Sequence, residues 1–214
     1  MHIPDGILPL PVTLGGYAVS VSIAWLCIRK IKQREDPRED IPKAALLTAA
    51  FFVASLIHIP IPPASVHLVL NGLLGALLGP FAFPAILIGL FFQAVMFGHG
   101  GLTTLGVNGI ILGLPALAAY AIFHLRKGHS RTAGPRKTAV FGFLAAFTAI
   151  CLSVLIFSMI LFTNMPAHLS AEAERTAITA LVLAHIPLAL LEGTLTALLA
   201  VFLLRASPAI LEGV

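Results

Sequence analysis

Long apolar runs, separated by short polar or Gly- and Pro-rich stretches, fill most of the chain. A helix needs about 20 apolar residues to cross the hydrocarbon core of a bilayer, and five runs come close to that length or exceed it. They lie at about residues 12–28, 43–59, 108–125, 138–163 and 178–204. Together they predict an all-α, polytopic membrane helical bundle, formed by residues 1–214 as a single membrane domain.

A further apolar stretch, residues 64–97, is interrupted by Pro80 and Pro84. It is too long for one ordinary span and slightly short for two. Two short helices would bring the bundle to seven spans, whereas a re-entrant hairpin would leave five. We predict two short helices, and therefore about seven transmembrane helices.

Basic residues gather in two loops, and this pattern predicts the orientation. Eleven of the thirteen Lys and Arg residues lie between positions 29 and 43 or between positions 126 and 137. Because cytoplasmic loops carry an excess of Lys and Arg, both loops are expected in the cytoplasm. Residues 64–97 must then add an even number of crossings. The N-terminus is expected outside, and the C-terminus in the cytoplasm.

The composition agrees with a membrane location and removes several alternatives. Charged residues make up 10% of the chain and the mean hydropathy is +1.00, whereas about a quarter of the residues in a soluble domain are charged. The net charge of +4 reflects the two loops and does not indicate a nucleic-acid partner. The patterns GxxxxGKS/T, HExxH and GxSxG are absent from the sequence, which argues against a P-loop ATPase, a zinc protease and a serine hydrolase.

The chain begins MHIPDG, without the basic n-region of a cleavable signal, so we expect this end to be kept. The amine of Met1, the amide nitrogen of His2 and the His2 imidazole can bind one metal ion and close two chelate rings. This planar nitrogen set leaves a fourth position for another imidazole and suits Ni(II) or Cu(II). Residues 1–11 are therefore a candidate metal-binding segment. In it, Asp5 is placed to accept a hydrogen bond from a ligand imidazole.

Two histidines of the predicted outer loops are candidates for the fourth ligand. His67 follows a Pro-rich loop at the start of an apolar helix, and His99 lies in GHGG. Glu192 is the one acidic residue deep in a predicted span, and it shares a helix face with His185. An intramembrane carboxylate is a functional candidate. Metal ligation, a structural hydrogen bond and a gating role are all open for Glu192.

The predicted helix 43–59 carries two pairs of alanines four positions apart. The pairs are Ala45 with Ala49 and Ala50 with Ala54. Small residues at this spacing let helices approach closely in a membrane, although alanine is common in this chain. These alanines are therefore a candidate docking surface for a membrane partner.

Four motifs, taken together, identify a resemblance that covers nearly the whole chain. They are MHIPDG at the start, SVHL at Ser65–Leu68, GHGGLTTLGVN at Gly98–Asn108 and HIPLALLEG at His185–Gly193. In these motifs the chain resembles the CbiM/NikM family. Its members are the substrate-binding S components of energy-coupling-factor transporters for cobalt and nickel in prokaryotic cell membranes.

The resemblance implies that residues 1–11 form a metal-binding segment inserted into the bundle. It implies that Met1, His2 and His67 hold the metal, and that His99 and Asn108 pack the loops or support the ligands. It implies a transport subunit rather than an enzyme, with Ni(II) or Co(II) as substrate and no cofactor. The implied partners are a transmembrane coupling protein, which would meet the alanine-rich helix, a pair of cytoplasmic ATPases and in some systems a small auxiliary membrane protein.

Two alternatives stay open at this point. A cobalt-specific uptake subunit that feeds cobalamin synthesis fits the same residues. A membrane enzyme or a regulatory subunit would instead use His185 and Glu192.

Overall fold

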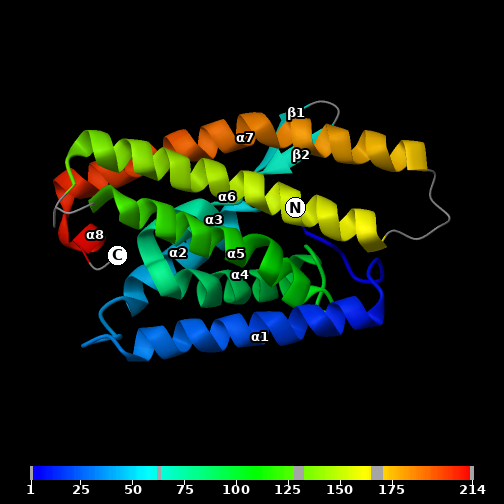
Figure 1. Ribbon diagram of the computed structural model, residues 1–214, viewed down its shortest axis with the longest axis horizontal. Helices are drawn as coiled ribbons and strands as arrows, with labels where there is room; N and C mark the ends of the chain where they lie inside the picture. The colour runs from blue at the N-terminus through cyan, green and yellow to red at the C-terminus, as the bar shows by residue number, and fades with distance from the viewer. Residues whose placement is uncertain (1, 62–63, 128–132, 165–170, 213–214) are drawn as a thin grey trace.

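The computed structural model describes residues 2–61, 64–127, 133–164 and 171–212, and over these residues the protein is a bundle of seven helices (Figure 1). The helices are α1 (Leu10–Lys32), α2 (Ile41–Ala54), α3 (Asn71–Leu78), α4 (Ala82–Phe97), α5 (Leu105–His124), α6 (Pro135–Asn164) and α7 (Ala171–Ala206). The minor elements are the 3-10 turns η1 (Gly79–Phe81) and η2 (Leu125–Lys127), the strands β1 (His58–Ile61) and β2 (Ala64–His67), and a short α8 (Ala209–Glu212).

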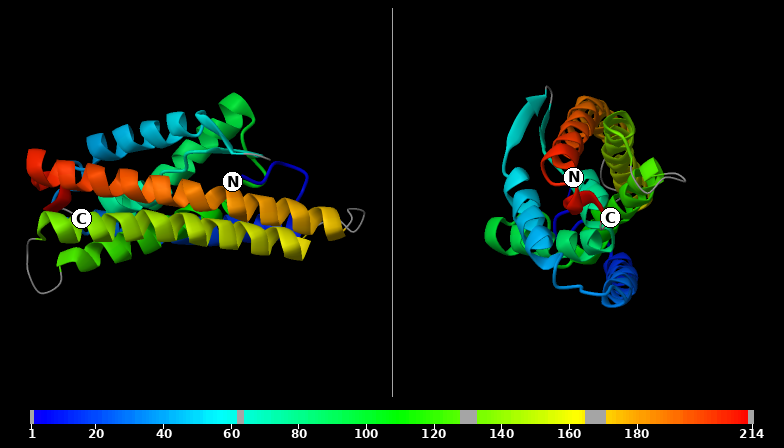
Figure 2. Two further views of the ribbon diagram at one scale, coloured as in Figure 1. Left: turned by 90° about the horizontal axis from the view of Figure 1, so that it is seen from above. Right: turned by 90° about the vertical axis from the view of Figure 1, so that its left-hand side faces the viewer.

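Consecutive helices run in opposite directions along the bundle, as the colour gradient in Figure 1 shows. The basic loop after α1, the end of α5 and the end of α7 all lie at one end, which we call the basic end. The segment before α1 folds back into the bundle at the opposite end (Figures 1 and 2). An odd number of passes therefore connects the start of α1 with the end of α7.

Five segments are long and apolar enough to cross a membrane, namely Leu10–Lys32, Asn71–Phe97, Leu105–Lys127, Pro135–Asn164 and Thr179–Ala206. The prediction of a polytopic helical bundle is thus confirmed. The expected span 43–59 is wrong at its end, because α2 stops at Ala54 and β1 begins at His58. Prolines at 60, 62 and 63 explain the difference, since proline lacks the amide hydrogen that a helix needs.

The stretch 64–97 forms a hairpin of two short helices, as predicted, rather than one long span. Gly79 ends α3 with a positive φ of 57°, a conformation that favours glycine. The chain then turns through η1, where the Arg34 guanidinium lies 5.6 Å from the Phe81 ring. The turn thus reaches the basic loop, so α3 and α4 make two passes.

α3 lies at the centre of the bundle, where all of its residues are buried, and α1 is peripheral. Of the most apolar 18-residue window in Asn71–Phe97, 78% is buried, whereas the corresponding window in Leu10–Lys32 is 22% buried. Small residues allow the close packing of α3: a Cβ at Gly72 would lie 2.4 Å from the Cα of Ala146, and one at Gly75 would lie 2.0 Å from the carbonyl oxygen of Ala116. With eight residues, α3 is only about 12 Å long. The extended backbone of β2, which precedes α3, covers the rest of this pass along the bundle.

Candidate metal centre

Three imidazoles meet beside the start of the chain. One ring nitrogen each from His2, His67 and His99 lie within 4.8 Å of one another. The His2 and His67 rings are stacked, with centroids 5.2 Å apart and planes 30° apart. The His99 ring stands nearly perpendicular to both, at centroid distances of 4.4 Å from His2 and 5.0 Å from His67.

Each imidazole comes from a different part of the chain. His2 lies in the segment before α1, His67 ends β2, and His99 follows α4. The β1–β2 hairpin fixes the place of His67, which pairs with His58 in the antiparallel register. α3 starts shortly after His67 and α4 ends shortly before His99. The α3–α4 hairpin therefore brings the His99 ring beside the His67 ring.

The contacts of His67 define which of its ring nitrogens faces a metal. Its Nδ1 lies 3.0 Å from the carbonyl oxygen of Leu68, and a carbonyl can only accept a hydrogen bond. Nδ1 therefore carries the proton and Nε2 carries the lone pair. Metal-binding histidines commonly donate their second ring N–H to a carbonyl in this way.

The surroundings of the His2 imidazole leave its ring nitrogens available to a metal ion. Neither ring nitrogen makes a hydrogen bond of ordinary geometry within the described residues, and both are shielded from solvent. Burial, together with the neighbouring His67 and His99 rings, lowers the pKa of His2 well below its usual value. The ring is therefore neutral at neutral pH and offers a lone pair.

Asn108 fixes the backbone that follows His2. Its side chain accepts a hydrogen bond from the N–H of Ile3 at 2.9 Å and donates one to the carbonyl oxygen of Ile3 at 3.0 Å. The hydroxyl of Thr104 donates a second hydrogen bond to the same carbonyl at 2.6 Å. Ile3, Thr104 and Asn108 are all buried. Asn108 thus anchors the N-terminal segment, while His99 lies inside the imidazole cluster rather than in a packing position.

Asp5 provides a second anchor at the mouth of the site. Its carboxylate accepts hydrogen bonds from the Thr103 N–H at 2.9 Å, the Thr103 hydroxyl at 2.5 Å and the Leu102 N–H at 3.2 Å. The bond from the Thr103 hydroxyl is the main reason why the pKa of Asp5 lies below its usual value. These partners differ from the ligand imidazole that the sequence suggested, so Asp5 acts on the loop before α5.

Glu192 lies outside the imidazole cluster. Its carboxylate accepts hydrogen bonds from the N–H groups of Val69 and Leu70, at 2.5 and 2.9 Å. His185 is bound elsewhere, with Nδ1 2.7 Å from the carbonyl oxygen of Leu181. Of the roles left open for Glu192, these contacts favour a structural hydrogen bond, and they do not form the catalytic pair that a membrane enzyme would need.

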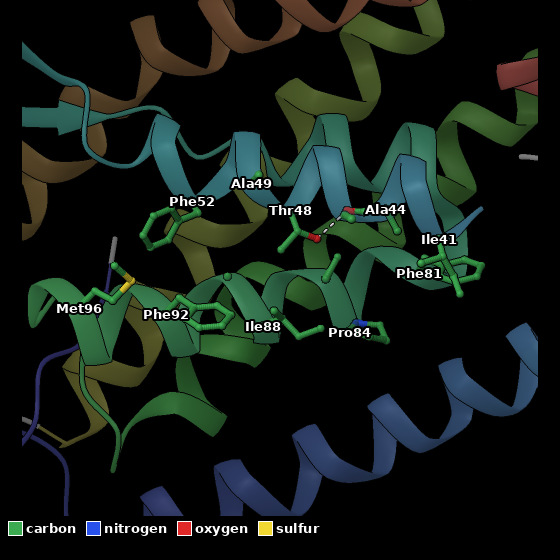
Figure 3. A pocket seen from close by; sticks show the side chains of 13 residues that line it. Ile41, Ala44, Thr48, Ala49, Phe52, Phe81, Pro84, Ile88, Phe92 and Met96 are labelled. Carbon is green, nitrogen blue, oxygen red and sulfur yellow. Dashed lines mark hydrogen bonds between the residues drawn. The ribbon is translucent and has the colours of Figure 1, made fainter. Parts of the chain in front are cut away.

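The remaining predicted residues fall in two places. Met1 lies outside the described residues. Ala45 and Ala49 line an apolar groove of about 500 Å³ between α2 and α4 (Figure 3). Ala54 is instead buried in the core, because α2 turns this face towards the bundle, and Ala50 does not line the groove. Of the four alanines, Ala45 and Ala49 thus line this groove, and their docking role stays a prediction.

Sequence reasoning missed Gln93, Thr103 and Thr104. Gln93 is fully buried on α4, and its amide lies close enough to the His2 ring to influence the pKa of that imidazole. Both polar atoms of the Gln93 amide make no hydrogen bond within the described residues. A glutamine inside the otherwise apolar run FFQAVMF was the available signal. The two threonines gave none beyond their place in the glycine-rich loop.

Comparison with known proteins indicates the family of the chain. The family CbiM, described as the cobalt uptake substrate-specific transmembrane region, matches residues 2–210. A cobalt transport protein CbiM of Clostridium tetani is 32% identical over 212 residues, covering 96% of this chain and 85% of that protein. The fused nickel transport protein NikMN of Rhodobacter capsulatus is 30% identical over 99% of this chain and 64% of its own length.

Two further matches differ in extent. A protein of Haemophilus influenzae, whose name marks it as a metal transport protein, is 40% identical over 126 residues, so the match spans 59% of each chain. The crystal structure of a truncated transition metal transporter superposes with a TM-score of 0.74 at 24% identity, over 96% of this chain and 99% of that one. This likeness supports the fold. With the family matched over almost its whole length, the chain belongs to the CbiM family of cobalt-uptake, substrate-specific transmembrane proteins.

Proposed function

We propose that the protein is the substrate-binding subunit of a transporter that takes up Ni(II) or Co(II). The observation that carries this proposal is the cluster of His2, His67 and His99 beside the anchored start of the chain. Nitrogen ligands suit these late transition metals and do not suit Mg(II) or Ca(II). The names of the cobalt and nickel relatives support the same substrates.

The proposed ligand set is the amine of Met1, the amide and imidazole of His2, and Nε2 of His67. Asn108 holds Ile3 against α5, and Asp5 is held against the loop before α5, so His2 is kept beside His67. His99 supplies a third imidazole near the same point. Because the amine and imidazoles bind metal only when deprotonated, affinity falls as the solution becomes acidic.

In the proposed orientation the metal site faces outside and the basic end faces the cytoplasm, according to the positive-inside rule. Uptake is then driven by a pair of cytoplasmic ATPases through a transmembrane coupling protein, with a small auxiliary subunit where one exists. The groove between α2 and α4 supports docking of the coupling protein, since Ala45 and Ala49 let another helix approach closely (Figure 3).

The decisive experiment adds three alanines before Met1, which moves the terminal amine out of reach of a joint chelate with His2. The matched control adds three alanines after Val214. Titration calorimetry and X-ray absorption would measure Ni(II) and Co(II) binding by both proteins, each purified without a polyhistidine tag. We expect the control to bind one ion through nitrogen ligands, and the N-terminal extension to abolish high-affinity binding.

Equal binding by the two proteins would refute the amine–amide–imidazole site. In that case the loop histidines would hold the metal alone, and MHIPDG would serve only as a lid. A competition titration between Ni(II) and Co(II) on the control protein would also decide whether a cobalt-specific subunit is the better description.

A further inference from the structure

Glu192 holds the backbone that joins the proposed ligand His67 to α3. It lies near the middle of α7 and is 1% exposed, yet no ion pair to its carboxylate occurs in the described part of the chain. Its two oxygens instead accept the N–H groups of Val69 and Leu70. The two oxygens of a buried carboxyl group thus face two consecutive backbone donors.

This backbone requires support because of its conformation. Leu70 precedes α3 and adopts a left-handed conformation with φ of 53°, which is rare for a residue other than glycine. The N–H of Leu70, at the cap of α3, has no partner within the helix. Glu192 supplies that partner from a different helix, since the cap residue itself provides no side-chain hydrogen bond.

The contacts form a continuous path from Glu192 to the proposed ligand. Nδ1–H of His67 donates to the carbonyl oxygen of Leu68 at 3.0 Å. That carbonyl and the N–H of Val69 belong to one peptide group, and this N–H donates to Glu192 at 2.5 Å. The Leu68–Val69 peptide is therefore held on one edge by the imidazole and on the other by the carboxylate.

A carboxylate in this position affects the imidazole in two ways. It fixes the plane of the peptide, and so the direction of the hydrogen bond that orients the His67 ring. It also polarises the peptide towards a stronger acceptor, which raises the basicity of Nε2. Direct carboxylate–histidine–metal arrangements act in the same way, and here one peptide group stands between the carboxylate and the imidazole.

We propose that Glu192 is a positioning residue for metal binding, which acts on His67 through the Leu68–Val69 peptide. This inference rests on the proposed function, because it requires His67 to be a ligand. It differs from direct ligation, since Glu192 touches backbone and is not part of the imidazole cluster. It also makes α7 a part of the metal site, although α7 contributes no ligand.

The test is a double-mutant cycle on the full chain with its own N-terminus. The variants are Glu192→Gln, His67→Ala and the combination, and the readout is the Kd for Ni(II) by titration calorimetry. Gln can accept only one of the two backbone hydrogen bonds. Loss of an outer partner of a metal ligand costs about 10- to 100-fold in affinity, so we expect that loss in Glu192→Gln. In the His67→Ala background the same substitution should have no further effect.

The matched control is Thr196→Val, which changes a buried side chain one turn further along α7. The Thr196 hydroxyl makes no hydrogen bond within the described residues, so this variant should bind Ni(II) as the native protein does. If Glu192→Gln does not fold, Glu192→Asp keeps the charge and withdraws the carboxylate by one methylene. It should weaken Ni(II) binding in the native background only.

The outcomes separate the two claims. Native affinity in a folded Glu192 variant, or an equal loss with and without His67, would overturn the positioning role. A native protein that binds no Ni(II) or Co(II), or whose affinity is unchanged by His67→Ala, would instead overturn the proposed function on which the inference rests.

Discussion

Removing the side chain of Asn108 should weaken metal binding without removing any proposed ligand. Asn108→Ala deletes both hydrogen bonds that hold the backbone of Ile3. The carbonyl of Ile3 keeps its bond from Thr104, but its N–H is left without a partner in a position that solvent does not reach, since Ile3 is 0% exposed. The lost hydrogen bonds destabilise the docked state of the N-terminal segment, in which His2 lies beside His67.

The magnitude follows from these two contacts. An unsatisfied buried donor costs about 1–3 kcal/mol, and the lost second hydrogen bond contributes about 1 kcal/mol. The docked state is therefore destabilised by about 2–4 kcal/mol, which corresponds to about 30- to 1,000-fold in population. Apparent affinity falls in proportion to the fraction of protein that is competent to bind. The Ni(II) affinity falls by this whole factor only when the N-terminal segment is undocked in most molecules of the variant.

The assay is Ni(II) titration of the purified protein with its native N-terminus. Asn164→Ala is the matched control, because among the described residues its side chain bonds to the last turn of α6 and the substitution is chemically the same. We expect weakened binding in Asn108→Ala and native binding in the control. Native affinity in a folded Asn108→Ala protein would show that docking of Ile3 does not limit metal binding, and the reasoning would fail.

Two further substitutions test how the segment is held against the loop before α5. A Cβ at Gly101 would lie 2.0 Å from Oδ1 of Asp5, so Gly101→Ala should reduce Ni(II) affinity about tenfold or more. The control Gly15→Ala, whose new Cβ would have nothing within 4 Å, should leave the affinity unchanged. Equal affinities of the two variants in titration calorimetry would contradict the close contact. Asp5→Asn should weaken binding about fivefold, because charge-assisted hydrogen bonds at an exposed site contribute about 1 kcal/mol. Since hydrogen bonds from Thr103 lower the pKa of Asp5 below its usual value of 3.8, its contribution is present above that value and lost only as the pH falls below it. The affinity ratio between native protein and Asp5→Asn should therefore stay constant from about pH 5 to 8, and a ratio that changes with pH would show that Asp5 titrates in this range.

The spans were predictable because hydropathy is a local property of the sequence. The hairpin of α3 and α4 was predictable for a different reason: the two basic loops required an even number of passes between them. The β1–β2 hairpin was not predicted, because the apolar residues around Pro60 continue the hydropathy of α2. Composition alone does not distinguish a helix end from a strand there.

The imidazole cluster was predictable in part, because His67 and His99 stand out in the sequence as polar residues in apolar surroundings, and the structure brings both beside His2. Chelation by Met1 and His2, expected from their covalent geometry, stays a prediction. The partners of Asp5 and Glu192 could not be inferred, because most of them are backbone groups, such as the N–H groups of Leu102 and Val69, which lie 97 and 123 residues away. A hydrogen bond to backbone leaves no pattern in side-chain types, so only the folded chain reveals it.

The anchoring of Ile3 by Asn108 also sets the order in which the protein becomes able to hold a metal ion. The two residues are 105 positions apart in the chain. Ribosomes add about 5–20 residues per second, so roughly 5 to 20 s pass between the synthesis of Ile3 and that of Asn108. A nascent chain in the membrane therefore exposes its first histidine well before the clamp for it exists. Metal capture is a property of the chain only after its first half has been inserted and folded.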